Sequence, residues 1–163
     1  TSTHTSLCRR YARAPRGIRA YGHVPRNHGH NVTLLAALTP AGIGPSMTIP
    51  GAIDSAAFAV YVRRLLVPSL HPGQVVILDN LSAHKSPRVE AVVRSAGAYL
   101  VFLPPYSPDY NPIEQCWSSI KRSLRKAKAR TFDTLLEALR IALLQVSSQD
   151  AIGWFDHCGY LAA

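Results

Sequence analysis

The segment QVVILDN, residues 74–80, decides the fold. Its continuous apolar run is typical of a strand buried on both faces, as in a parallel sheet. Residues 98–103, AYLVFL, repeat the pattern, and between the two runs lies a helix predicted from about 87 to 96 and ended by Gly97. Strand, helix and strand in this order predict an α/β domain. Active sites form just past the C-terminal ends of such strands, and Asp79 has that position.

The remaining elements follow from hydrophobic periodicity and turn residues. Residues 31–39 predict a strand and 45–49 a second one, whereas 1–30 predict irregular backbone or short strands. Asp54 is the predicted N-cap of a helix that runs to about Leu66. Three further helices are expected at about 112–127, 131–146 and 148–157.

Length and composition are those of one domain with a real core. The chain has 163 residues, of which 47% are apolar, so residues 1–163 are expected to form a single domain. No apolar run is long enough for a membrane span, and the polar, Arg-rich start does not resemble a secretory signal. The three cysteines are scattered without a CxxC pair, which predicts free thiols in a reducing compartment.

The charge is strongly positive and unevenly distributed. Eighteen Lys and Arg oppose nine Asp and Glu, which gives a formal net charge of +9. Six Arg lie in 9–26 and six Lys or Arg lie in 121–130. Such clustering indicates a polyanionic partner, because neutralising phosphates releases counterions. A basic protein without such a partner is the alternative that charge alone leaves open.

Asp79 and Glu114 are the candidate catalytic residues, and each also has a purely structural interpretation. A carboxylate that ends a buried strand is costly to desolvate unless it is paired, hydrogen-bonded or bound to metal, yet Asp79 also suits an Asx-turn. Glu114 follows Asn111-Pro112-Ile113, so it lies at the third helical position behind an Asn N-cap, where a capping-box carboxylate is expected. The residues taken singly leave both interpretations open.

The helix that Glu114 begins favours the functional interpretation. Its exposed face is predicted to carry one acid followed by a basic track, and its opposite face is apolar. The acid is Glu114, and the basic track that follows it is Ser118, Lys121, Arg125 and Lys128. The apolar stripe is Ile113, Trp117, Ile120 and Leu124. A metal-binding acid beside a phosphate-binding track is the expected layout for cutting nucleic acid, with an ordinary solvated face as the alternative.

Two blocks of sequence resemble a known family. DNLSAHK, residues 79–85, and LPPYSPDYNPIE, residues 103–114, resemble the signature blocks of bacterial insertion-sequence transposases related to the mariner superfamily. The 34 residues between Asp79 and Glu114 match the spacing of the second and third catalytic acids in that family. The resemblance extends to Pro15-Arg16-Gly17, to 31–39 and to the C-terminal Gly159-Tyr160, so it covers nearly the whole chain.

The resemblance implies an RNase H-like fold and a DDE transposase that cleaves and transfers DNA strands. In the family three acids hold two divalent metal ions, Mg²⁺ or Mn²⁺, and Asp79 and Glu114 match the second and third acids. The motif positions with a structural role would be Asn80, Pro105, Asn111 and Pro112. The DNA-binding candidates are Arg9, Arg10, Arg13, Arg16, His84, Lys85, Lys121, Arg122, Arg125, Lys126 and Lys128, and Arg130 extends the same basic run.

The main departure from the family is its first acid. In relatives this acid closes the first, central strand, just before a Thr/Ser-rich stretch, and here the chain begins inside that stretch at Thr1-Ser2-Thr3. No Asp or Glu precedes Asp54, which lies in the wrong context. We therefore expect the domain to lack its first strand, its first acid and the N-terminal helix-turn-helix region. We also expect the chain alone to be inactive, because of gene decay, truncation or a frame joined to an upstream product by slippage.

Other residues carry weaker signals. His84 would contact DNA, steady the metal site or be an ordinary loop histidine. A zinc site at His23, His28 and His30, or at His157-Cys158, is disfavoured because no paired CxxC or HxxxH accompanies it. Trp117 and Trp154 have core spacing. Tyr106 and Tyr110 would stack on an unpaired base or, more simply, pack in their own loop.

Two other functions stay open beside transposition. One is an RNase H-like nuclease without strand transfer, and the other is a DNA-binding module without catalysis. For the leading interpretation, the resemblance implies DNA partners (element ends and target), a homodimer on paired ends and no membrane. It also implies a cytoplasmic, nucleoid-associated location in a bacterium.

Overall fold

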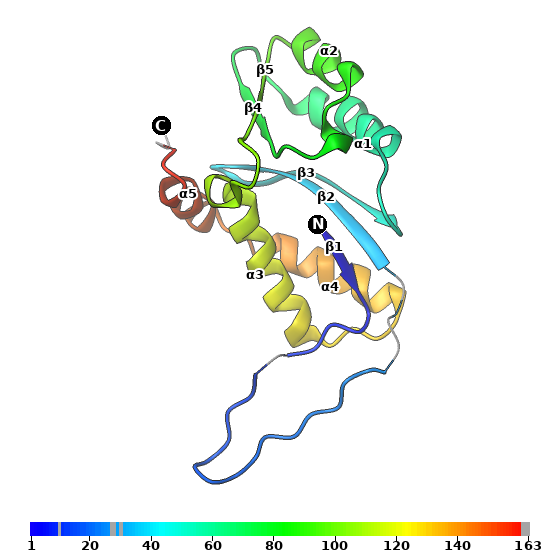
Figure 1. The fold of residues 1–163 in the computed structure, drawn as a ribbon, viewed down its shortest axis with the longest axis vertical. Helices are drawn as coiled ribbons and strands as arrows, with labels where there is room; N and C mark the ends of the chain where they lie inside the picture. Colours follow the sequence, from blue (N-terminus) through cyan, green and yellow to red (C-terminus); the bar gives the residue numbers. More distant parts are fainter. Residues whose placement is uncertain (10, 27–28, 30, 161–163) are drawn as a thin grey trace.

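The computed structural model describes residues 1–9, 11–26, 29 and 31–160. Figure 1 shows two small sheets with helices between and around them, and a long excursion that leaves the body after β1 and returns at β2. We call this excursion the arginine arm and define it as residues 9 and 11–26. Its backbone contains no strand or helix, and almost every one of its side chains is exposed. Within the described ranges no helix is both long and apolar enough to span a membrane.

The first sheet is antiparallel, in the order β1-β2-β3. Strands β2 (Asn31–Thr39) and β3 (Gly42–Pro50) form a hairpin with a register shift between Ala36 and Leu38. Residues Ser2–His4 form a three-residue strand, β1, which pairs with the start of β2. This strand corrects the expectation that the first strand is absent, because the long β2 offers backbone partners to even a short extended segment.

The second sheet has two parallel strands, β4 (Val75–Leu78) and β5 (Tyr99–Phe102), as predicted. Helix α2 (Pro87–Ser95) connects them and ends before Gly97, whose φ of +73° suits glycine. Helix α1 (Ser55–Tyr61) begins at its predicted N-cap, since the Asp54 carboxylate accepts a hydrogen bond of 2.8 Å from the Ala57 amide. The backbone beyond α1 continues as a π-helical turn over Val62–Leu66 and a 3-10 turn over Val67–Ser69.

Three helices complete the chain at the predicted places: α3 (Pro112–Ala127), α4 (Phe132–Leu144) and α5 (Ser148–His157). Thr131 and Ser147 cap α4 and α5 with reciprocal capping boxes. In Figure 1, α3 and α4 lie on one side of the β1-β2-β3 sheet, and α1, α2 and the β4-β5 sheet lie on the other. The apolar stripe predicted for α3 is confirmed, because Trp117, Ile120 and Leu124 are buried.

Strand β2 lies between two apolar cores. Val32 and Leu34 belong to the core that β2 forms with α3 and α4, whereas Leu35 belongs to the core with α1, the π-helical turn and α2. The expectation that both inner strands are buried on both faces is wrong for β4 and β5. Val75 is 54% exposed and Tyr99 is 64% exposed, because helices cover only one face of their sheet.

Candidate active site

Asp79 lies directly after β4, and its side-chain contacts with the described residues are made through one oxygen, Oδ1. Oδ1 accepts a hydrogen bond of 3.2 Å from the Leu81 amide, so the Asx-turn interpretation is correct as far as it goes. The same oxygen lies 2.6 Å from Nδ1 of His84. Oδ2 has no hydrogen bond or ion pair with the described part of the chain. Oδ1 therefore contacts the loop after β4, and Oδ2 is available to a ligand.

His84 is packed behind that carboxylate. It ends a 3-10 turn, Ser82–His84, whose backbone places the ring beside the end of β4. Its side chain is only 17% exposed. The ring centroid lies 4.2 Å from that of Phe58, a buried residue of α1, at an interplanar angle of 32°. Of the three roles considered from sequence, this geometry favours steadying the acid site.

Glu114 lies in the first turn of α3 and is exposed. The capping-box interpretation is wrong, because Asn111 makes no side-chain capping bond. The contact between them is through the backbone, from the Glu114 amide to the Asn111 carbonyl at 3.0 Å. Pro112 at the first helical position and Asn111 before it do begin the helix, as the motif predicts. The Glu114 carboxylate has no hydrogen bond or ion pair with the described residues, so it is free to bind a cation.

Both acids lie near the amino group of Thr1. This ammonium donates a hydrogen bond of 2.9 Å to the Leu34 carbonyl. Burial and then the charge of Lys121 lower its pKa, and the carboxylates of Glu114 and Asp79 partly offset that shift. Asp79 and Glu114 therefore lie within Coulombic range of one charged group at the start of β1. In the described ranges no three His, Cys, Asp or Glu side chains gather into a metal-binding group.

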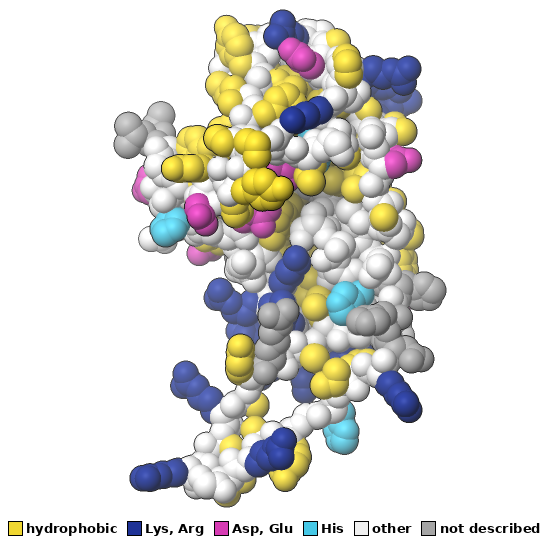
Figure 2. Space-filling view, viewed as in Figure 1, with side chains coloured by type: hydrophobic (Ala, Val, Ile, Leu, Met, Phe, Trp, Pro, Cys, Tyr) yellow, Lys and Arg dark blue, Asp and Glu magenta, His cyan; other side chains and the backbone are white. Residues whose placement is uncertain are grey.

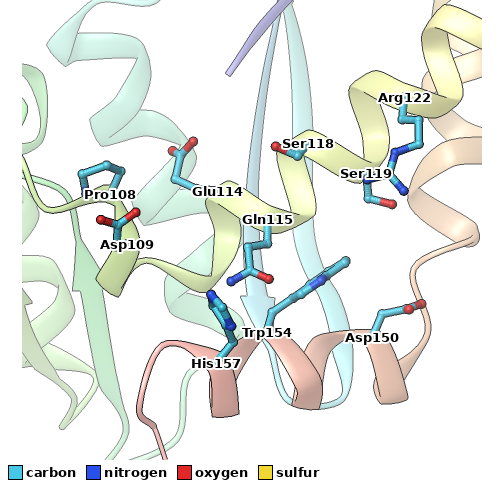
Figure 3. A pocket seen from close by; sticks show the side chains of 10 residues that line it. All are labelled: Pro108, Asp109, Glu114, Gln115, Ser118, Ser119, Arg122, Asp150, Trp154 and His157. Carbon is cyan, nitrogen blue, oxygen red and sulfur yellow. The ribbon is translucent and has the colours of Figure 1, made fainter.

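A groove of about 490 Å³ runs between α3 and α5, with Glu114 among its lining residues. Figure 3 shows Glu114 leaving α3 on the side away from α5, while Gln115 points towards Trp154 and His157. Its lining residues are Pro108, Asp109, Glu114, Gln115, Ser118, Ser119, Arg122, Asp150, Trp154 and His157. Three carboxylates against one guanidinium make this groove unlike the basic track, so it is a poor place for phosphate.

The predicted DNA-binding side chains lie on two surfaces. On α3 and just beyond it, Arg122, Lys126 and Lys128 are exposed, and Lys121 and Arg125 are half-buried. On the arginine arm and the loop after β4, Arg9, Arg13, Arg16 and Lys85 are exposed, while Arg10 lies outside the described residues. Figure 2 shows Lys and Arg side chains, without Asp or Glu, over the arm and the region beside it.

Arg130 is the exception among the basic residues. Its Nη1 donates to the carbonyl oxygens of Thr5, at 2.9 Å, and Leu7, at 3.0 Å. The side chain that was assigned to DNA therefore holds the start of the arginine arm. The sequence could not predict this contact, because more than 120 residues lie between the partners.

The remaining candidates divide plainly. Trp117 is buried as predicted, whereas Trp154 is half-buried and lines the groove. The prediction that Tyr106 packs in its own loop is wrong, because it is fully exposed at a φ of +57°. Tyr110 is 58% exposed, and its carbonyl accepts a hydrogen bond from Tyr160.

All three cysteines are free thiols, His23 is exposed, and His28 and His30 lie outside the described residues. Asn80 is half-buried after β4, and Pro105 is exposed in the proline-rich loop before α3, residues 103–111, which we call the proline loop.

Comparisons with known proteins show the family of the chain. A family model described as DDE superfamily endonuclease matches residues 1–136. The chain is 26% identical over 121 residues to the transposable element Tc1 transposase of Caenorhabditis elegans. The matched region covers 72% of this chain and 44% of that protein. The Mos1 transposase paired-end complex with left transposon end superposes with a TM-score of 0.73 at 12% identity, over 98% of this chain and 49% of the other.

A second solved structure gives the same fold. The Mos1 transposase catalytic domain with Raltegravir and Mg superposes with a TM-score of 0.68 at 15% identity, over 80% of this chain and 71% of that one. The fold is thus RNase H-like, as expected. This chain spans about half the length of the Tc1 protein and of the Mos1 chain in the paired-end complex.

Proposed function

Because this chain belongs to the DDE superfamily endonucleases, we propose that it is the catalytic domain of a transposase that cleaves and transfers the ends of a DNA element. The observation that carries the proposal is that Asp79 and Glu114 both lie close enough to Thr1, just before β1, to act on it electrostatically. One acid ends an inner strand and the other begins a helix, so 34 residues of intervening chain fold to bring them together.

We assign Asp79 and Glu114 as ligands of divalent cations, Mg²⁺ or Mn²⁺, with two ions in the complete enzyme. The donor set fits such ions, since carboxylate oxygens are the ligands that both prefer, and each residue has an uncommitted oxygen. Bound at these carboxylates, such ions would supply activation of an attacking hydroxyl and stabilisation of the leaving oxygen. The carboxylates of Asp79 and Glu114 would hold the ions, and α3 positions Glu114.

The third acid of the family's set is assigned to chain preceding Thr1 or to an upstream reading-frame product. Two hydrogen bonds support this placement, because Thr1 and Leu34 exchange both of their backbone bonds, at 2.8 and 2.9 Å. A segment that continued this pairing would run along β2 towards the acids. With two carboxylates in place of three, the 163-residue chain alone is expected to bind the metals weakly and to have little or no activity.

DNA is the substrate we assign to the basic surfaces. The basic track on α3 ends near Glu114, so a strand that follows it with its phosphates would present its sugar-phosphate backbone to the acids. A homodimer on paired ends fits the Mos1 structures described as paired-end complexes. A bacterial origin and a cytoplasmic, nucleoid-associated location are proposals that follow from the insertion-sequence resemblance.

The test is a nicking and strand-transfer assay on DNA that carries the inverted repeats flanking the coding sequence. The chain joined to its upstream segment should cleave and transfer strands only with Mg²⁺ or Mn²⁺. Asp79→Asn and Glu114→Gln should each abolish both steps while leaving DNA binding in EDTA intact. Strand cleavage without any strand transfer would point instead to a nuclease.

A DNA-binding module without catalysis is the second candidate for the isolated chain. It is favoured by one observation: among the described residues, no three His, Cys, Asp or Glu side chains gather where they could hold a metal ion. Calorimetry with Mn²⁺ separates the two candidates, because a pure binding module takes up no metal at Asp79. Detectable Mg²⁺-dependent nicking by the chain alone would contradict both this candidate and the expected inactivity.

A further inference from the structure

The two oxygens of the Asp79 carboxylate have different surroundings. Oδ1 is contacted by the Leu81 amide and by Nδ1 of His84. Oδ2 is contacted by neither. The pattern is one-sided, because the Leu81 hydrogen bond and the His84 ring contact both fall on Oδ1.

The His84 ring contacts Phe58 as well as Asp79. Phe58 stacks on its ring at 4.2 Å and is itself only 4% exposed, so the ring rests on the core formed by α1, the π-helical turn and α2. The backbone of the 3-10 turn fixes its Cα, since the His84 amide donates to the Leu81 carbonyl at 3.0 Å. A ring confined on both sides has few rotamers left, which is what a group that aims another side chain requires.

We propose that His84 is a positioning residue for Asp79, which holds Oδ1 through Nδ1 and so presents Oδ2 to a divalent cation. The inference deepens the proposed function and rests on it. It also assigns a role to Phe58, which keeps the imidazole in place. A second group that orients a metal-binding carboxylate typically changes metal affinity about 10- to 100-fold when it is removed.

The geometry argues against a phosphate contact by this histidine and against metal ligation through its Nδ1. A phosphate contact needs an accessible ring, and this one is 17% exposed between Phe58 and a carboxylate. Metal ligation through Nδ1 would require a lone pair on the atom that faces Oδ1 at 2.6 Å, where two lone pairs would repel. The contact between Nδ1 and Oδ1 is close at 2.6 Å, but it does not have the geometry of a hydrogen bond.

Two isosteric substitutions separate the ring nitrogens. The amide nitrogen of Asn superposes on Nδ1 of histidine, and that of Gln superposes on Nε2. The probe is Mn²⁺ binding to the 163-residue chain, followed by water-proton relaxation, which detects weak affinities. His84→Asn should keep near-normal affinity, whereas His84→Gln and His84→Ala should weaken it about tenfold. His71→Asn and His71→Gln, at an exposed loop histidine, are the matched controls and should change nothing.

Each outcome decides the matter. Asp79→Asn and Glu114→Gln must themselves reduce Mn²⁺ affinity, and if neither does, the metal site of the proposed function fails. If they do and every His84 variant binds like the parent, the positioning role alone is overturned. If His84→Gln keeps the Mn²⁺ affinity and His84→Asn loses it, the contact depends on Nε2 and the proposed role of Nδ1 is overturned. A loss of DNA affinity in EDTA by His84→Asn would also overturn the positioning role. Should His84→Ala unfold, Phe58→Leu serves instead, with an expected loss of a few-fold.

Discussion

The guanidinium of Arg130 donates a hydrogen bond to the carbonyl oxygen of Thr5 at 2.9 Å, across 125 positions of sequence. The same Nη1 reaches the Leu7 carbonyl at 3.0 Å. One side chain at the junction of α3 and α4 thus binds the backbone at the point where β1 gives way to the arginine arm. The arm begins from a fixed base although its own side chains are exposed.

Arg130→Met should loosen this base. The substitution keeps most of the aliphatic stem and removes the donors, and we expect the free energy of unfolding to fall by about 1 kcal/mol, the value for ordinary hydrogen bonds at a solvent-exposed site. Hydrogen exchange of the Leu7 amide, which donates to the His4 carbonyl, should accelerate. Lys126→Met, on an exposed position of α3, is the control. Equal stability for the two variants would show that the clamp contributes nothing.

The same two variants test which basic residues contact DNA. Neutralising a phosphate-binding side chain lowers the slope of log affinity against log salt by about one. Lys126→Met should therefore reduce the slope by about one. Arg130→Met should reduce it less, because hydrogen bonds to the Thr5 and Leu7 carbonyls already fix the direction of the guanidinium. Fluorescence anisotropy over a range of salt concentrations gives both slopes. A larger change for Arg130 would return it to the DNA surface.

Lys128→Gly should stabilise the protein. Lys128 ends α3 at φ +52° and ψ +37°, a left-handed conformation that favours glycine, and its amide donates to the Leu124 carbonyl at 3.2 Å. Relief of that strain outweighs the extra freedom of the unfolded glycine, so we expect a gain of about 0.5 kcal/mol in the free energy of unfolding. Lys126→Gly, inside the last turn, should destabilise by up to about 1 kcal/mol. Urea denaturation distinguishes the signs, and a loss at both sites would contradict the argument.

Local patterns predicted what is local. The bounds of β2, α3 and α5 follow from periodicity and caps, and the spacing of Asp79 and Glu114 indicated the acid pair because the motif blocks are continuous in sequence. What could not be predicted depends on distant partners. Strand β1 is too short to show a period, and Arg130 looks like any other residue of a basic run until the chain folds.

The extent of burial was the second feature that the sequence could not predict. The apolar run of β4 predicted coverage of both faces, but an apolar strand shows only that burial is favourable. Which helices are available to provide it depends on tertiary structure, and here Val75 is left 54% exposed. Phe58 illustrates the same point, because nothing in the sequence of α1 shows that its ring packs against His84.

Cys116 should make stability fall at alkaline pH. Burial and then the charge of Asp150 raise the pKa of its thiol from 9.0 to about 12. A folded-state pKa above the unfolded value means that the folded chain holds the proton more tightly, so the stabilisation is complete below pH 9 and is lost as pH rises from 9 towards 12. The contribution of this thiol changes by at most about 1.4 kcal/mol per pH unit. Urea denaturation at pH 8, 9, 10 and 11 should show a shallower decline for Cys116→Ala than for the parent, with Cys8→Ala as the half-buried control. Parallel declines for all three proteins would mean that another group governs the alkaline limb.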